Sequence, residues 1–408
     1  MPVPVVLVIA TLDTKAEEAA YIKKRIELHG CRALLMDTSL LGGSALGGDI
    51  NRTEVAKAGG AVFEELVKQD KGTCIRVMMK GCAALAASLY RKGAFHGVIA
   101  IGGAQGTDIG TAAMRELPFG LPKFMVSTVA SGRASFGPYV GTKDIIMMHS
   151  VADIQGLNFL TRTVFDNAVA AVCGMLTMPP ETGGVQERPA VAMSMLGTTT
   201  PGAMRAHRIL RERGYDAVAF HQNGTGGIAM EDLIREGRFK AVLDINLHEI
   251  GDAVAGGLHA AIRDYRLTSA GELGIPQLIA PGSINYAVWG PEPTLTPELR
   301  SHKYIVHNPQ LTLVRLTPDE LRKTAEITAG RISRAKGPAH VFIPLKGLSH
   351  PDREGGGHWE PESNEIFFKT LKKNMDPRIP YDELDMHIND PEFIDAVTGE
   401  LLRILEKA

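Results

Sequence analysis

The stretch VIAIGGAQGTDIGTAA, residues 98–113, contains a buried-type strand, a glycine-rich turn and the start of a helix built from small residues. Gly102, Gly103 and Gly106 would let a backbone approach a ligand closely, and a helix start offers unpaired N–H groups to an anion. The stretch matches neither the GxxxxGK[ST] nor the GxGxxG phosphate-binding pattern. Two interpretations therefore stay open: a cradle for phosphate, or a tight turn that packs a helix against a sheet.

The alternation of strand and helix extends through the chain on both sides of this stretch. We expect strands at 3–10, 32–37, 97–103, 123–128, 144–150, 190–196, 216–221 and 241–245, with helices between them. We also expect a helix at 248–262, later strands at 276–282, 303–307 and 340–345, and a turn at Asn308-Pro309. The segment PPETGGVQERP (179–189) has no periodicity and is the best domain boundary. Such alternation is typical of parallel sheets covered by helices. We therefore predict an α/β protein with two doubly wound Rossmann-like domains (1–180 and 189–408), mostly parallel sheets and an interdomain cleft.

The composition excludes some classes of partner. The 44 Lys+Arg and 46 Asp+Glu leave a net charge of −2, so no broad basic face for nucleic acid or an anionic membrane is expected. The first apolar stretch breaks at Asp13, and no later run approaches the roughly 20 residues of a spanning helix. Cys31, Cys74, Cys82 and Cys173 are scattered, which is typical of reduced thiols in a cytoplasmic protein and makes a zinc site on cysteines improbable.

Ligands of an open parallel sheet bind beyond the carboxyl ends of its strands. In the first domain the candidate nucleotide-binding residues follow three strands, and they are Thr11, Asp13, Thr14, Lys15, Gly102, Gly103, Gly106, Thr107, Ser131 and Gly132. Asp13 has an equal alternative role as an N-terminal helix cap. The threonine and serine hydroxyls would add donors for phosphate oxygens.

The second domain has its own polar residues at predicted strand ends. The candidate substrate-binding residues are Thr198, Thr199, Gly224, Gly226, Gly227, Asp244 and Ser349, and the candidate catalytic residues are His221, Glu231 and Glu249. A histidine with carboxylates could supply general acid–base chemistry or hold a hydrated divalent ion. The alternative is a set of helix caps and surface charges, which we favour for Asp252. HEIGD (248–252) is not the HExxH zinc motif, because position 252 is Asp.

Several strings taken together resemble one known family. ATLDTK (10–15), GGAQGT, FHQNGTGGIAME, HNPQLTL, PLKGLS with Asp352, and HINDPEF occur in order along the chain. They resemble the bacterial and fungal proteins that share the N-terminal ATP-binding region of the tomato mosaic virus resistance protein. The resemblance implies ATP in a Rossmann-like first half, and a homodimer; Asp13 is our own candidate for holding Mg²⁺ through water. Asn285 and His248 depart from the aspartate and threonine that the family pattern leads us to expect.

Three functions remain open at this point. The first is a cytoplasmic enzyme of small-molecule metabolism that uses ATP·Mg in its first domain and His221 with Glu249 on an organic or sugar acid in its second. The second is a hydrolase or lyase that acts on a carbonyl acid without ATP. The third is a non-catalytic protein whose interactions depend on a nucleotide.

Overall fold

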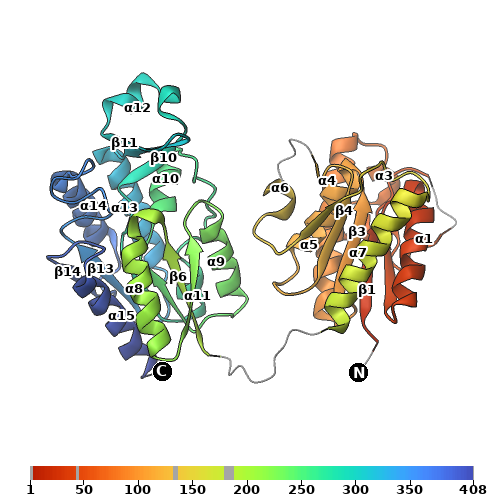
Figure 1. The fold of residues 1–408 in the computed structure, drawn as a ribbon, viewed down its shortest axis with the longest axis horizontal. Helices are drawn as coiled ribbons and strands as arrows, with labels where there is room; N and C mark the ends of the chain where they lie inside the picture. The colour runs from red at the N-terminus through yellow and green to blue at the C-terminus, as the bar shows by residue number, and fades with distance from the viewer. Residues whose placement is uncertain (1–2, 43–45, 132–136, 179–187, 408) are drawn as a thin grey trace. The chain divides into compact units, whose positions relative to one another are not determined.

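The structure is a computed structural model, and it describes residues 3–42, 46–131, 137–178 and 188–407. The chain folds into two compact units, Met1–Val185 and Gln186–Ala408. The predicted boundary at 179–189 contains the point of division. Figure 1 shows helices around a sheet in each unit. The α/β fold with two Rossmann-like units is confirmed, whereas the cleft between them stays a prediction.

The first unit is built on a parallel five-stranded sheet of order β2-β1-β3-β4-β5. Its strands are β1 Val5–Ala10, β2 Arg32–Asp37, β3 Gly97–Gly102, β4 Lys123–Ser127 and β5 Ile146–His149. Its helices are α1 Leu12–Leu28, α2 Arg52–Ala58, α3 Phe63–Leu66, α4 Lys71–Arg91, α5 Ala104–Arg115, α6 Gly137–Val140 and α7 Phe159–Thr177.

Helices cover both faces of this sheet, which explains why its central strands read as continuous apolar runs. All six residues of β1 are buried, and their side chains alternate between two cores. Val5, Leu7 and Ile9 join the core beneath α4 and α5, while Val6 and Val8 join the core beneath α1 and α7. A strand with two buried faces needs no polar alternation.

The second unit contains a parallel six-stranded sheet of order β14-β13-β9-β8-β6-β7. Its strands are β6 Ala190–Met195, β7 Asp216–His221, β8 Ala241–Asp244, β9 Gln277–Ile279, β13 Ala339–Pro344 and β14 Tyr381–Leu384. Its helices are α8 Thr200–Glu212, α9 Gly226–Arg235, α10 His248–Ala255, α11 Ser269–Leu273, α12 Pro297–Ser301, α13 Pro318–Ile332, α14 Pro361–Asn374 and α15 Pro391–Leu405, with the 3₁₀ turns η1 Gly197–Thr199 and η2 Glu292–Thr294.

Chain order within the two sheets is alike. In each unit the first strand lies between the second and the third, and the later strands follow the third. The chain therefore reverses its direction of winding between β1 and β3 in the first unit and between β6 and β8 in the second. This reversal is the point at which open α/β sheets bind ligands.

A small antiparallel sheet, absent from our expectations except for one strand, is inserted between β9 and β13. It consists of β10 Tyr286–Trp289, β11 Tyr304–Asn308 and β12 Leu311–Arg315, in the order β10-β12-β11. The predicted Asn-Pro turn joins β11 to β12, and the Asn308 side chain accepts the amide of Gln310. This sheet supplies side chains to the second-unit pocket described below.

Two expectations about helices need correction. The helix expected at 248–262 ends at Ala255, because Gly256 adopts a left-handed conformation and the chain turns back. The apolar runs in α4 and α7, at 21 and 19 residues, are long and apolar enough to span a membrane by length and composition alone. Both helices instead contribute buried side chains to the cores of the first unit, as Met78 and Phe165 illustrate.

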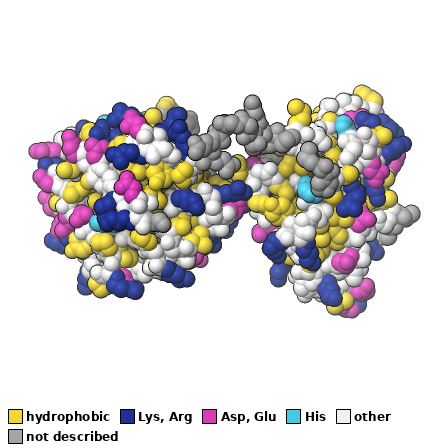
Figure 2. All heavy atoms as spheres, turned by 90° about the horizontal axis from the view of Figure 1, so that it is seen from below, with side chains coloured by type: hydrophobic (Ala, Val, Ile, Leu, Met, Phe, Trp, Pro, Cys, Tyr) yellow, Lys and Arg dark blue, Asp and Glu magenta, His cyan; other side chains and the backbone are white. Residues whose placement is uncertain are grey.

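The charged side chains are mixed in sign. On the face drawn in Figure 2, basic and acidic side chains are both scattered over each unit. All four cysteines are unpaired and buried. Burial raises the pKa of the Cys82 thiol to about 12, so this thiol is a core group rather than a nucleophile.

Candidate functional site

Each unit has a pocket beyond the carboxyl ends of its central strands. The first-unit pocket has a volume of about 320 Å³ and lies after β1 and β3, at the reversal of winding. Its lining residues are Thr11, Asp13, Thr14, Lys15, Leu41, Lys71, Gly103, Ala104, Gln105 and Gly106. The structure therefore brings six of the ten predicted nucleotide-binding residues into one pocket.

The other four predicted residues lie elsewhere. Gly102 is the last, buried residue of β3, directly before the lining residue Gly103. Thr107 is fully buried, and its hydroxyl bonds the Gly103 carbonyl and the Ser127 hydroxyl, at 2.8 and 2.6 Å, so it braces α5 against the sheet. Ser131 is an exposed residue after β4, and Gly132 lies outside the described residues.

The start of α5 is the polar centre of the first-unit pocket. Its N-cap, Gly103, has no side chain to bond the first amides, and only the Thr107 amide returns to the Gly103 carbonyl. The amides of Ala104, Gln105 and Gly106 have no acceptor among the described residues. A 12-residue helix thus presents three free donors and the positive end of its dipole to the pocket.

The glycines around this turn have two different roles. A side chain at Gly102 would place its Cβ 2.6 Å from the Cα of Gly106, so Gly102 is required by the close packing of α5 on β3. A Cβ at Gly103 would meet its nearest neighbour at an ordinary 3.6 Å. Both interpretations of the turn are therefore compatible. Gly102 allows α5 to pack closely on β3, and Gly103 leaves the first amides of α5 without a side-chain acceptor.

The start of α1 differs from the start of α5, because its amides are already bonded. The Leu12 amide donates to the Asp37 carboxylate at 3.2 Å and the Asp13 amide to the Ser39 hydroxyl at 2.8 Å. Asp13 Oδ2 accepts the amides of Leu40 and Leu41. Asp13 therefore fixes the loop after β2 rather than capping its own helix.

The second-unit pocket has a volume of about 310 Å³ and lies after β6 and β7, beneath the small antiparallel sheet. Its lining residues are Leu196, Gly197, Thr198, His221, Asn223, His259, Tyr286, Val288, His307, Leu311 and Leu313. Thr198 and His221 are the predicted site residues that it includes. The Thr198 hydroxyl forms two buried hydrogen bonds, one with the Tyr286 hydroxyl at 2.8 Å and one with the Ser283 hydroxyl at 2.7 Å.

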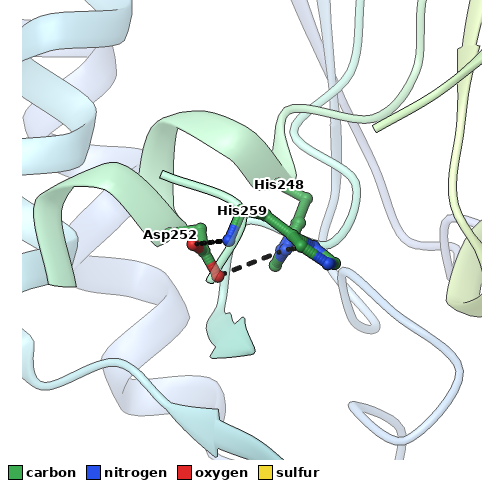
Figure 3. A group of neighbouring side chains, drawn as sticks. All are labelled: His248, Asp252 and His259. Atoms are coloured by element: carbon green, nitrogen blue, oxygen red, sulfur yellow. Dashed lines mark hydrogen bonds and ion pairs between the residues drawn. The ribbon is translucent and has the colours of Figure 1, made fainter. Parts of the chain in front are cut away.

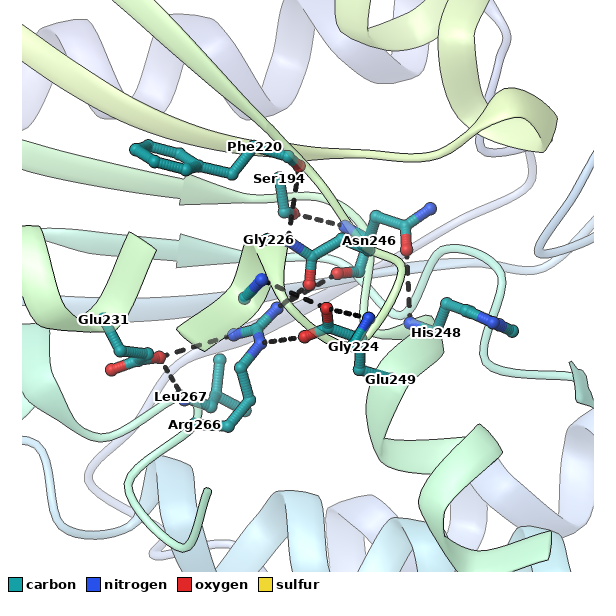
Figure 4. A network of polar contacts seen from close by, with 12 residues as sticks. Ser194, Phe220, Gly224, Gly226, Glu231, Asn246, His248, Glu249, Arg266 and Leu267 are labelled. Atoms are coloured by element: carbon teal, nitrogen blue, oxygen red, sulfur yellow. Dashed lines mark hydrogen bonds and ion pairs between the residues drawn. The ribbon is translucent and has the colours of Figure 1, made fainter. Parts of the chain in front are cut away.

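Behind this pocket lies a buried charge network centred on Arg266 (Figure 4). Its guanidinium binds the Asp244 carboxylate through two nitrogens, and it also contacts Glu249 at 3.3 Å and Glu231 at 3.5 Å. The Gln222 side chain and the Asn246 carbonyl accept further bonds. Burial alone would lower the pKa of Arg266, but the three carboxylates outweigh it and raise that pKa.

The predicted catalytic carboxylates belong to this network and do not line the pocket. Glu249 Oε1 accepts the amides of Gly224 and Gly227, at 2.8 and 3.0 Å. Glu231 accepts the amides of Leu267 and Ser269, and burial raises its pKa. Each carboxylate is thus occupied in holding a loop beside the pocket.

The predicted glycine loop wraps around Glu249. Gly224 has a φ of +94°, which favours glycine. A Cβ at Gly226 would lie 1.8 Å from the His221 carbonyl oxygen, and a Cβ at Gly227 would lie 1.8 Å from Glu249 Oε2. These glycines therefore bring the backbone to the carboxylate, and through it they position the loop that carries His221.

Three further side chains meet at the rear wall of the second-unit pocket (Figure 3). His248 Nε2 lies 3.1 Å from His259 Nδ1 and 3.4 Å from Asp252 Oδ1. Asp252 also accepts the amides of Val288 and His259, at 2.6 and 2.7 Å. His248 and Asp252 are fully buried, while His259 reaches the pocket. This group could hold a metal ion.

Burial shifts the titration of this group. It lowers the pKa of His248 to about 3, with the charge of His259 adding to the effect, and it also lowers the pKa of His259. Burial raises the pKa of Asp252 to about 6. Because His248 Nδ1 faces the Ser283 carbonyl at 3.3 Å, we assign its proton to Nδ1, which leaves a lone pair on Nε2.

Two of the remaining predicted substrate residues are buried. Thr199 accepts the Asn246 side-chain amide at 2.8 Å. The Ser349 hydroxyl has no hydrogen-bond partner among the described residues, and neither has the side-chain amide of Asn285. Neither Thr199 nor Ser349 lines the second-unit pocket.

Sequence reasoning missed Lys71, His259, Tyr286 and Arg266. Lys71 opens α4, far from any predicted strand end, and Tyr286 lies on a strand that was not expected. Arg266 lies in an irregular segment, where no motif indicates its role. The one available hint was that the second unit has many acidic residues at strand ends, which need a buried cation as partner.

A larger cavity of about 390 Å³ lies at the opposite edge of the second sheet, near the start of β13. Its most basic side chains, Arg378 and Arg403, pair with Asp376 and Glu400. We do not assign chemistry to it, because these charges already satisfy one another.

Comparison with known proteins follows the same division into two units. The model of the N-terminal domain of the uncharacterised protein family UPF0261 matches residues 4–181, and that of its C-terminal domain matches residues 188–405. A UPF0261 protein of Clostridium tetani is 40% identical over 405 residues, which cover 98% of this chain and 99% of the relative. A UPF0261 protein of Rhizobium meliloti is 36% identical over 398 residues, covering 97% of each chain.

A plant protein is also similar. The ToMV resistance protein Tm-1(GCR237) of Solanum lycopersicum is 34% identical over 344 residues, which cover 83% of this chain. The match spans 45% of the tomato protein.

Proposed function

This chain belongs to the UPF0261 family, and from that premise we propose that its first unit binds ATP with Mg²⁺ in the pocket at the start of α5. The observation that carries the proposal is the set of three free amides at residues 104–106, which face the same pocket as Lys15 and Lys71. ATP itself is expected from the resemblance set out in the sequence analysis.

Charge supports an anionic ligand at this position. Lys15 and Lys71 form no ion pair with a described residue, so two ammonium groups and a helix N-terminus act on one pocket. Asp13 is the carboxylate on its lining, and its Oδ2 is bonded to the loop after β2. We propose that Asp13 Oδ1, which has no partner among the described residues, holds Mg²⁺ through a water molecule.

A neighbouring pocket provides a place for the adenine ring. This pocket, of about 240 Å³, shares Leu41, Lys71 and Gln105 with the first-unit pocket. Its other lining residues are Leu40, Val67, Gln69 and Cys74, most of them apolar. Leu41 is 75% exposed, and a planar base packed on it would remove that apolar surface from water. Phosphates at α5 and a base on Leu41 give the ligand one orientation.

Calorimetric titration with ATP·Mg tests this proposal. We expect saturable binding by the wild type, and a dissociation constant about ten- to a hundredfold higher for Lys71→Ala, the usual loss for one charge-assisted hydrogen bond. Lys68→Ala is the matched control, because Lys68 is exposed on the same segment but pairs with Glu65 outside the pocket. Wild type that fails to bind at millimolar ATP, or equal losses in both variants, would refute the site.

The second-unit pocket favours a second candidate function. His221 and His259 line it together with the Thr198 hydroxyl and Tyr286, which provides imidazoles and hydroxyls suited to proton transfer on an organic acid. We propose an acid–base role for His221, with Glu249 as a positioning residue that acts through the loop 222–227. Product analysis after incubating candidate carbonyl acids with and without ATP separates an ATP-dependent enzyme from a hydrolase or lyase. Turnover by neither route, combined with ATP binding, leaves the non-catalytic interaction protein.

A further inference from the structure

The group formed by His248, Asp252 and His259 carries an inference that is independent of nucleotide binding. Two imidazole nitrogens and one carboxylate oxygen from this group all lie within 4.8 Å of one another (Figure 3). His248 Nε2 is at the centre, 3.1 Å from His259 Nδ1 and 3.4 Å from Asp252 Oδ1. Ligands of tetrahedral zinc at about 2.0–2.1 Å are separated by about 3.3–3.4 Å, so two of the three separations match that geometry closely.

The lone pairs of His248 Nε2 and Asp252 Oδ1 point toward each other, and a cation between them would be bound by both. His248 donates its Nδ1 proton to the Ser283 carbonyl, so Nε2 is an acceptor. Asp252 Oδ1 faces it and is an acceptor too. If His259 Nδ1 carries a proton and donates it to His248 Nε2, Asp252 Oδ1, which accepts the Val288 amide, still lies 3.4 Å from the same Nε2 with no proton between the two atoms. A cation bound by all three atoms removes that conflict.

The surroundings orient the three side chains as metal ligands are usually oriented. A ligating imidazole commonly donates its second nitrogen to a carbonyl, as His248 does to Ser283. The Asp252 carboxylate is held by the amides of Val288 and His259. The latter bond also pins the backbone of His259, because the chain turns back at Gly256.

The buried charges near this group are predominantly negative. Asp252 follows Glu249 by one turn of α10, and Glu249 shares Arg266 with Asp244 and Glu231. Three of these four buried carboxylates contact the single guanidinium of Arg266, whereas Asp252 does not, and half-buried Arg331 is a second cation that acts on Glu231. A divalent cation would balance the formal excess of two negative charges.

We propose that His248, His259 and Asp252 form a zinc site whose remaining coordination position opens on the second-unit pocket through His259. Two nitrogen ligands favour zinc over the oxygen-seeking ions Mg²⁺ and Ca²⁺. Three protein ligands with one open position are the pattern of zinc sites that bind a water molecule or a substrate oxygen. The site would accordingly take a carboxylate or carbonyl oxygen of a small molecule in the pocket.

Metal analysis of the full chain tests the site without ATP and without an activity assay. Chelator-treated protein is titrated with Zn²⁺, dialysed and measured for bound zinc, and Co²⁺ is added in parallel to read the visible bands of a four-coordinate ion. We expect one zinc per chain for the wild type. His248→Ala and His259→Ala should each weaken binding at least about a hundredfold, because each removes one of three ligands.

His207→Ala is the matched control, because His207 lies on α8 of the same unit, outside this group and outside the pocket. It should retain one zinc per chain. Circular dichroism checks that the variants fold, and His259→Ala or Asp252→Asn replaces His248→Ala if the latter does not. Zinc at blank level in the wild type would show a hydrogen-bonded histidine pair only and would overturn the proposal, as would full zinc content in folded His259→Ala.

Discussion

Replacing Arg266 by methionine is the sharpest test of how the second unit is held together. Arg266 is fully buried, and it is the cation shared by Asp244, Glu249 and Glu231. Methionine keeps much of the side-chain volume but removes the charge and every hydrogen bond of the guanidinium. The carboxylates would then remain in the interior without their counter-ion.

The expected loss is about 3–5 kcal/mol in the free energy of unfolding of the second unit, the usual cost of removing one partner from a buried ion pair. Asp244 loses two hydrogen bonds, and Gln222 and the Asn246 carbonyl each lose one. Neutralising the main partner should recover part of this loss. Arg266→Met with Asp244→Asn should therefore be destabilised by less than the sum of the two single variants.

Tryptophan fluorescence during urea unfolding is the suitable assay, because both tryptophans of the chain, Trp289 and Trp359, lie in the second unit. The signal therefore reports on that unit alone. Arg205→Met is the control: Arg205 pairs with Asp395 at the surface, where an ion pair contributes at most about 1 kcal/mol. A loss below about 1 kcal/mol for Arg266→Met would refute the reasoning that this guanidinium neutralises the buried carboxylates.

Two further outcomes follow from particular positions in the second unit. Gly226→Ala should destabilise that unit by about 2 kcal/mol or more by urea unfolding, because its Cβ would lie 1.8 Å from the His221 carbonyl, whereas Gly330→Ala, with open space around it, should be neutral or slightly stabilising. Burial, followed by the charge of Arg315, lowers the pKa of His358 from 6.5 to about 4. The unfolded chain therefore binds more protons at this histidine between those values, and the contribution of His358 to stability should fall by up to about 3 kcal/mol as the pH drops from 6.5 to 4. In His358→Phe this slope should shrink, and an unchanged slope would contradict the assignment.

The order of strands and helices could be predicted from the sequence because each central strand is buried on both faces. Runs such as VVLVIA at β1 carry no polar residue, and such runs indicate parallel strands between two layers of helices. The strands of the small antiparallel sheet were harder to predict. Only β11 was expected, because all three strands are four or five residues long and runs this short carry little periodicity, even where a turn such as that at Gly282 precedes the strand.

The site could be predicted only in part, and the reason is long-range contact. Residues after β1 and β3 of the first unit could be grouped because parallel strands end at the same edge, so Thr11 and Gly103 were expected together. Lys71 reaches that pocket from the start of α4, which no local pattern indicates. The general location of the first-unit pocket was therefore predictable, but not the full set of charges around it.

In the second unit, residue type was a poor guide to role. Glu249 and Glu231 were expected at the reacting centre, yet both face Arg266, which lies 17 and 35 residues further along the chain. Asp252 was expected to be an ordinary helix charge, yet it is fully buried beside His248. Burial and pairing arise from tertiary packing, and neither is visible in the spacing of acidic residues.

The shared strand order makes particular positions of the two units equivalent. The helix after the third strand is α5 in the first unit and α10 in the second, and both begin at the reversal of winding. In the first unit this helix begins with small residues and bare amides, whereas in the second the same place is filled by His248 and Glu249. The same position of one architecture thus presents backbone donors in the first unit and side-chain acceptors in the second.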